Sequence, residues 1–250
     1  MKGAIIYFSG TGNTEFVAKL FKKAFEEKGY EMDLIEVTKQ IKFKDDYSIL
    51  VFGSCIHSEV FPDVYMRWID KNILNGNSRR CIVFSTQAAK SAAGANILSD
   101  TLKKRGFNVS IVEHIVMPNN FYVVAFGKDT KEEVKQKTKK AEELVYEIVD
   151  SFLKDIKKIK EVSEIRKRYG NLAYSFFKKY AKTWAMKKIS VDYDLCVKCL
   201  KCVSNCPTKN INFKDEIEFQ DKCICCQRCI HQCPVNAFKY KGKHFEQYKI

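Results

Sequence analysis

Features that mark several common protein classes are scarce or missing from this sequence of 250 residues. No apolar run approaches the roughly 20 residues that a membrane-spanning helix needs. The N-terminal segment MKGAIIYFSG leads directly into a strand-like run and has no signal-peptide cleavage site, so we expect a cytoplasmic protein. Cys55 and Cys81 are the only cysteines before Leu195, and two are too few for the disulfide framework of a secreted domain.

Acidic residues are lacking in one part of the chain. The formal net charge is +14, but residues 1–151 carry 22 Lys+Arg and 20 Asp+Glu, whereas residues 152–188 carry 12 and 3. A basic segment of this kind can bind nucleic acid, an anionic membrane surface or an acidic redox partner. It can also be a solvated helix face, which is the interpretation we favour. No nucleic-acid recognition motif accompanies the lysines, so we do not expect nucleic acid as a partner.

Nine of the eleven cysteines lie between Leu195 and Pro234, in two blocks with the spacing C-x2-C-x2-C-x3-C-P and one additional cysteine, Cys225. In this spacing three thiolates hold one cluster and the fourth reaches the other cluster. A zinc site fits the repeated fourth cysteine and proline poorly, and a disulfide scaffold needs an oxidising compartment. We therefore predict two [4Fe–4S] clusters and a small buried Cys225. One cluster would be held by Cys196, Cys199, Cys202 and Cys233, and the other by Cys206, Cys223, Cys226 and Cys229. The stretch resembles a bacterial two-cluster ferredoxin.

A strand–loop–helix unit opens the chain. An apolar strand over Ala4–Phe8 runs into the hexapeptide SGTGNT, and apolar residues at helical spacing follow until Gly29. The hexapeptide consists of Ser9, Gly10, Thr11, Gly12, Asn13 and Thr14. Such a junction directs backbone N–H groups, hydroxyls and the helix dipole at an anion. It matches neither nucleotide-binding glycine motif and contains no Lys or Arg. The loop resembles the FMN phosphate loop of flavodoxins, and a plain strand-to-helix turn is the alternative.

Strand-like and helical segments continue to alternate up to residue 156. Further strands are expected at Met32–Val37, Ser48–Gly53, Cys81–Ser85 and Val109–Met117, with helices between them and a long amphipathic helix after the last. Repeated strand–helix units form parallel sheets with right-handed crossovers. We therefore predict an α/β domain, a doubly wound parallel sheet of five strands in the flavodoxin-like order 2-1-3-4-5.

Three more loops should lie beside the phosphate loop, because ligands of such sheets bind beyond the carboxyl ends of the strands. The first contains Ser54, Cys55, Ile56 and His57, the second runs from Thr86 and Gln87 to Gly94, and the third contains Asn119, Asn120 and Phe121. The resemblance to flavodoxins implies that these loops contact the flavin ring. The first loop has no aromatic before Phe61, so His57 or Ile56 would cover the ring.

Simpler interpretations of the same loops stay open. His57 can be an ordinary loop histidine, Cys55 a packed thiol, and the two asparagines a turn after Pro118. We also hypothesise that Glu59, beside a phosphate loop without cations, disfavours an anionic reduced flavin.

SGTGNT, the MPNNF segment at residues 117–121 and the paired cysteine blocks together resemble the flavodoxin–ferredoxin fusion family of anaerobic bacteria and archaea, the ferrodoxins. The resemblance implies a flavodoxin-like FMN-binding domain at residues 1–156 and a smaller α+β ferredoxin domain with two clusters at residues 189–250. Residues 157–188 would form a basic amphipathic helical linker. We expect its apolar stripe, from Leu172 to Ala185, to pack against a domain.

This resemblance implies an electron-transfer protein that passes single electrons between two [4Fe–4S] clusters and FMN, so no catalytic side chain is expected. The alternative is an enzyme, a flavin-dependent reductase that uses cluster electrons to reduce a quinone, oxygen or a nitro compound. Redox partner proteins are expected, and a membrane surface is not. A homodimer or a place in a larger redox complex is left open.

Overall fold

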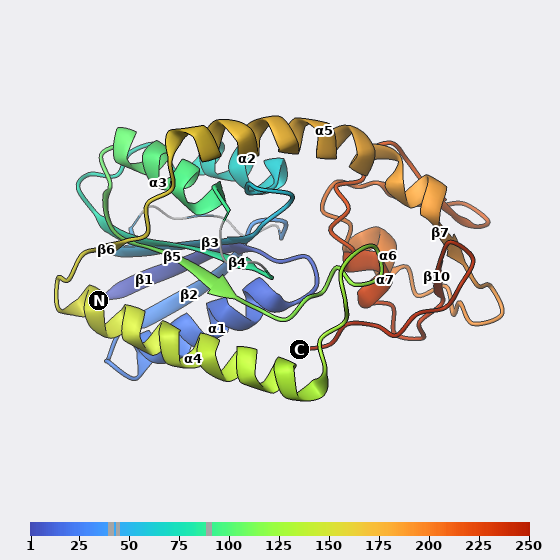
Figure 1. Ribbon diagram of the computed structural model, residues 1–250, viewed down its shortest axis with the longest axis horizontal. Helices are drawn as coiled ribbons and strands as arrows, with labels where there is room; N and C mark the ends of the chain where they lie inside the picture. Colours follow the sequence, from blue (N-terminus) through green and yellow to red (C-terminus); the bar gives the residue numbers. More distant parts are fainter. Residues whose placement is uncertain (40–42, 44–45, 89–91) are drawn as a thin grey trace.

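The structure is a computed structural model that describes residues 1–39, 43, 46–88 and 92–250 (Figure 1). Its larger part is a six-stranded parallel sheet with the order β2-β1-β3-β4-β5-β6. The strands are β1 (Lys2–Phe8), β2 (Glu31–Glu36), β3 (Ile49–Cys55), β4 (Arg80–Gln87), β5 (Asn108–Val116) and β6 (Lys158–Ile159). The first five strands have the predicted order, which is the flavodoxin-like arrangement.

The sheet contains one strand more than the five predicted. β6 lies at the edge and pairs with β5 through Ile111 with Lys158 and Val112 with Ile159. It falls inside the segment expected to be a helical linker, where helix α5 begins only at Glu164. A strand of two residues is too short to show an alternating pattern, so the sequence offers no signal for it.

Helices cover both faces of the sheet (Figure 1). α1 (Asn13–Glu26) and α4 (Lys131–Leu153) lie on one face, and α2 (Asp63–Asn72), α3 (Gly94–Lys104) and the first half of α5 (Glu164–Lys188) lie on the other. The central strand β3 is consequently buried along almost its whole length. This explains its continuous apolar sequence ILVFG, because a parallel strand covered on both faces has no polar side.

The smaller part of the molecule consists of residues 189–250. β7 (Ile189–Val191) pairs antiparallel with β10 (Phe238–Tyr240), and β8 (Ile211–Phe213) pairs antiparallel with β9 (Ile217–Phe219). Two single-turn helices, α6 (Lys201–Ser204) and α7 (Arg228–His231), follow within the cysteine blocks. α5 reaches from the sheet to this part, where Trp184 joins its core (Figure 1). Among the described residues, no helix has both the length and the apolar character needed to cross a membrane.

Candidate functional site

The loop between β1 and α1 forms a cradle of the kind that binds anions. Gly12 has a φ of 120°, a conformation that side chains disfavour, and its N–H donates a hydrogen bond to Ser9 Oγ at 3.2 Å. α1 begins at Asn13, so its first N–H groups and the positive end of its dipole face the loop. Thr14 is fully buried beneath the loop, where its Oγ1 lies 2.7 Å from Thr86 Oγ1. The end of β4 therefore holds the cradle from below.

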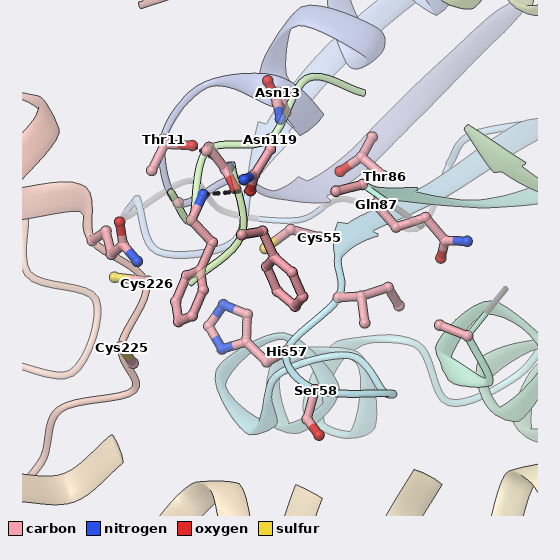
Figure 2. A pocket seen from close by; sticks show the side chains of 18 of the residues that line it. Thr11, Asn13, Cys55, His57, Ser58, Thr86, Gln87, Asn119, Cys225 and Cys226 are labelled. Atoms are coloured by element: carbon pink, nitrogen blue, oxygen red, sulfur yellow. Dashed lines mark hydrogen bonds between the residues drawn. The ribbon is translucent and has the colours of Figure 1, made fainter. Parts of the chain in front are cut away.

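A cavity of about 540 Å³ opens beside this cradle (Figure 2). Its volume is in the range of small-molecule and cofactor sites. All four predicted loops contribute to it, through Gly10, Thr11, Asn13, Cys55, Ile56, His57, Thr86, Gln87, Asn119, Asn120 and Phe121. The carboxyl ends of the strands thus bring together segments that are more than 100 residues apart in the sequence.

The remaining predicted site residues support the cavity wall from behind. They are Ser9, Gly12, Thr14, Ser54 and Gly94. Ser54 is buried, and its hydroxyl donates to the Cys55 carbonyl oxygen at 3.1 Å. Gly94 provides space for the neighbouring loop, since a Cβ there would lie 2.8 Å from Ile56 Cδ1. Residues 89–91 of the predicted second loop lie outside the described residues.

The two adjacent asparagines after β5 have different roles. Asn119 Nδ2 donates to the Gly127 carbonyl oxygen at 2.7 Å, and its Oδ1 accepts from the Phe121 N–H at 2.9 Å. This is the turn that the simpler interpretation predicts. Asn120 Nδ2 donates to Thr11 Oγ1 and ties this loop to the phosphate loop. Both side chains therefore hold the cavity wall in shape.

Three buried side chains that line the cavity have a nitrogen without a hydrogen-bond partner among the described residues. These atoms are His57 Nδ1, Gln87 Nε2 and Gln227 Nε2. A buried polar group left without a partner costs about 1–3 kcal/mol. The polar edge of a flavin ring carries carbonyl oxygens and ring nitrogens that can accept such hydrogen bonds. The residues present therefore fit a flavin in this cavity.

His57 lies inside the cavity, in the space between Cys55 and Cys226 (Figure 2). Its ring centroid is 6.3 Å from that of Phe8 and 5.9 Å from that of Phe177. Burial lowers the pKa of His57 to about 4, so the ring is neutral at pH 7. A neutral ring packed among aromatic side chains is a suitable surface for a flat ligand. Phe177 comes from α5, and no local pattern in the sequence connects it with this loop.

Each predicted set of four cysteines surrounds its own small cavity. One cavity is lined by Cys196, Cys199, Cys202 and Cys233, and the other by Cys206, Cys223, Cys226 and Cys229. In both sets three thiols come from one block and the fourth comes from the other block, and all eleven cysteines of the chain are free. Burial raises the pKa of Cys223 to about 12, so its thiolate form requires the positive charge of a bound metal. Each set can hold one four-iron cluster.

Backbone N–H groups point at two of these sulfur atoms in equivalent positions. The Asn210 N–H donates to Cys206 Sγ at 3.2 Å, and the Ala237 N–H donates to Cys233 Sγ at 3.4 Å. In each block the donor lies four residues beyond the last cysteine of the motif. Hydrogen bonds of this kind to cluster sulfur influence the reduction potential. The additional Cys225 is 3 % exposed, so the expectation of a small buried side chain is confirmed.

Comparisons with known proteins concern the two parts of the chain separately. Residues 188–211 match the family model of a 4Fe–4S binding domain. The chain therefore joins a flavodoxin-like fold to a 4Fe–4S binding domain. A search of curated proteins gives no match.

Several solved flavodoxins are similar to the first part of the chain. A flavodoxin from the domain Archaea has 14% sequence identity and a TM-score of 0.42, covering 60% of this chain and 99% of its own. Flavodoxin 1 from Bacillus cereus has 18% identity and a TM-score of 0.42, covering 58% and 97%. Two-electron reduced Megasphaera elsdenii flavodoxin has 19% identity and a TM-score of 0.41, covering 56% and 98%.

The flavodoxin-like part and the 4Fe–4S part share the walls of the large cavity. Cys225, Cys226 and Gln227 line it from the 4Fe–4S part, next to the phosphate loop. The two loops are in close contact, because a Cβ on Gly10 would lie 2.6 Å from the Cys226 carbonyl oxygen. The sequence analysis missed this wall, since the contact joins residues more than 200 positions apart. Gly10 gave no signal for this contact, because a glycine is expected in a phosphate loop whether or not another segment packs against it.

Arg228 fixes this contact. Its side chain is 10% exposed, and its guanidinium donates to the Ser9 carbonyl oxygen at 2.5 Å and to Glu36 Oε1 at 3.1 Å. It also donates to Thr38 Oγ1 at 2.9 Å. A residue between two cluster cysteines thus forms a buried ion pair with the sheet edge and holds the phosphate loop.

The hypothesis about charge near the flavin keeps one of its two premises. The phosphate loop contains no cation of its own, and Arg228, which contacts its Ser9 carbonyl oxygen, is paired with Glu36. The Glu59 carboxylate accepts from Nε and Nη2 of the Arg166 guanidinium at 2.8–3.1 Å, so its negative charge is compensated. That the site disfavours an anionic reduced flavin stays a prediction.

Proposed function

We propose that this chain is an electron-transfer protein that connects two [4Fe–4S] clusters with an FMN held in the large cavity. The phosphate of FMN would bind the N–H groups and hydroxyls of residues 9–14. The ring would lie against His57, with Gln87 and Gln227 as hydrogen-bond donors from the two walls of the cavity. Bound FMN can exchange one or two electrons, whereas each cluster exchanges one. The protein holds the groups close together and excludes water from between them.

The observation that carries this proposal is the shared wall. Cys226, a ligand of the second predicted cluster, lines the same cavity as the phosphate loop and the predicted flavin loops. No protein segment therefore needs to move to bring the second cluster beside the flavin.

The first predicted cluster is placed for contact with another protein. Cys199 is exposed, and the neighbouring Val197 and Leu195 are 62% and 44% exposed. Cys225, beside the second cluster, is buried. Exposed apolar side chains around a redox centre are suited to brief contact with a partner. We infer that electrons enter or leave through the first cluster and reach the flavin through the second.

Anaerobic purification followed by assays of iron, sulfide and flavin tests the proposal. We expect about eight iron, about eight sulfide and one FMN per chain, because two cubane clusters have that content. In the unmodified chain, a low-potential donor should reduce the clusters, and the clusters should then reduce the flavin. In the Cys199→Ser variant, which removes a ligand of the first cluster, this reduction should be slowed while FMN content is unchanged. Purified protein that contains zinc or no flavin would overturn the proposal.

One observation supports the reductase as a second candidate. Phe126 lines the large cavity and is 82% exposed, so the cavity reaches the surface at that residue. A small acceptor such as a quinone, oxygen or a nitro compound could then approach the flavin directly. Steady-state turnover with these acceptors separates the carrier from the reductase. A carrier reduces the acceptors slowly, and its rate does not saturate as the acceptor concentration rises.

A further inference from the structure

Helix α5 has two different apolar faces. The inner face carries Tyr174, Ala181, Trp184 and Ala185, which are at most 6% exposed. The sequence analysis assigned Ala181, Trp184 and Ala185 to one packed stripe together with Leu172 and Phe176. In the structure the stripe divides, and the second group of side chains points away from both parts of the molecule.

The outer face is a continuous row of large exposed side chains. Ile165, Tyr169, Leu172 and Phe176 are 80%, 56%, 60% and 64% exposed. Their spacing of four, three and four residues places them on one side of the helix, over a length of about 17 Å. Single exposed apolar residues are common, but a contiguous row usually marks an interaction site.

Positive charges border this row. Helix α5 contains eight Lys and Arg residues and one Glu. Some of the cations are paired inward, such as Lys167 with Asp100 and Lys178 with Asp63. Arg168, Lys179, Lys182, Lys187 and Lys188 have no ion-pair partner among residues 1–39, 43, 46–88 and 92–250. Arg168 lies beside the row, and the other four cations follow it along the helix, so the outer side of α5 is apolar over residues 165–176 and cationic beyond them.

We propose that the outer face of α5 docks on an anionic lipid surface. An interfacial helix places its apolar row among the acyl chains near the headgroups, and its Lys and Arg residues pair with anionic lipids. The tyrosine in the row has an apolar ring and a polar tip, which suits the same depth. α5 lies along the outside of the molecule, so this face is accessible over its length (Figure 1).

The same features disfavour two other occupants. A second copy of the chain would bring its own unpaired lysines against those of the first, and like charges repel. A stable protein partner holds its strongest contact residues in well-packed, desolvated pockets. None of the four side chains of the row lines either large cavity of the described residues. A convex row with adjoining cations matches a fluid anionic surface better than a shaped protein surface.

Vesicle co-sedimentation of the holoprotein tests the proposal. We compare vesicles of phosphatidylcholine alone with vesicles that also contain phosphatidylglycerol, and expect strong binding only to the anionic ones. The double variant Leu172→Ser and Phe176→Ser should lower the partition coefficient about 30-fold, because it removes two large apolar side chains. Lys179→Gln should lower it about fivefold and high salt should weaken binding further.

Matched controls keep the result specific. Leu74→Ser removes an apolar side chain that is 70% exposed elsewhere, and Lys135→Gln removes an exposed cation of α4. Both should leave vesicle binding unchanged. The proposal is overturned if anionic vesicles bind no better than neutral ones, or if the double variant binds like the original chain. It is also overturned if sedimentation analysis shows a dimer that only the Leu172→Ser and Phe176→Ser variant dissociates.

Discussion

The ion pair between Glu36 and Arg228 should be one of the strongest links between the two parts of the molecule. Both side chains are nearly buried, at 7% and 10% exposed, and Glu36 Oε1 lies 3.1 Å from Arg228 Nη2. Glu36→Gln keeps the shape of the side chain but leaves the guanidinium buried without its counter-charge. Removing one partner of a buried pair costs about 3–5 kcal/mol. Because the hydrogen bond to the Ser9 carbonyl oxygen remains, we expect a loss of about 3 kcal/mol in the free energy of unfolding.

Thermal unfolding of the holoprotein, followed by circular dichroism under anaerobic conditions, measures this loss. A cost of about 3 kcal/mol lowers the Tm of a chain of this size by about 6–12 °C. Iron content is measured alongside, because Arg228 lies between Cys226 and Cys229 and loss of a cluster would also lower the Tm. The matched control is Glu15→Gln, which breaks the exposed pair with Lys19 and should cost less than about 0.5 kcal/mol. Equal losses for the two variants would refute the reasoning.

Three further predictions concern the cavity. Gly10→Ala places a Cβ 2.6 Å from the Cys226 carbonyl oxygen, so it should lower FMN affinity about tenfold, as measured by flavin fluorescence. The control Gly127→Ala adds a Cβ in open space and should leave FMN affinity unchanged. Gln87→Leu removes a buried nitrogen that has no hydrogen-bond partner, so it should raise the stability of the flavin-free protein. It should also lower FMN affinity about 2–10-fold. Unchanged affinity would show that the flavin does not bind this amide. His57 is neutral in the folded protein, with a pKa of about 4, but becomes protonated in the unfolded chain below its ordinary value of 6.5. The free energy of unfolding should therefore fall as the pH drops from 6.5 toward 4, and His57 should account for about 2 kcal/mol of the loss at pH 5. His57→Gln should flatten the plot of unfolding free energy against pH in that window. A plot that is not flattened contradicts the effect assigned to burial of His57.

Local motifs in the sequence were sufficient to predict two parts of the site. The spacing of the cysteines predicts which thiols come together, and the structure groups them in the same two sets of four. The hexapeptide at residues 9–14 predicts a cradle at a helix start, because its residue types and position are both local properties. The alternation of strands and helices predicts a parallel sheet, and the order of its first five strands was predicted from the match to the flavodoxin-like arrangement.

Contacts between distant segments had no such signal. Phe177 and Gln227 line the cavity only because α5 and the second cysteine block fold onto the sheet. The apolar residues of α5 illustrate the same difficulty. Helical spacing shows that Trp184 and Phe176 are on an apolar helix, but only the packed structure shows that Trp184 is buried and Phe176 exposed.

The shared cavity couples cofactor binding to the arrangement of the two parts. One wall consists of strand-end loops and the other of residues 225–227, so a ligand that contacts both walls binds only when the parts are docked. By mass action such a ligand stabilises the docked arrangement, by about 2.7 kcal/mol at a concentration one hundred times its Kd. The Glu36–Arg228 pair acts in the same direction, since it holds the cavity in the bound form before the ligand arrives. Electron transfer needs a fixed short distance between redox groups more than it needs a catalytic side chain. Under the proposed function Arg228 keeps that distance fixed, because it joins the loop of the second predicted cluster to Glu36 of β2 and to the Ser9 carbonyl oxygen of the phosphate loop.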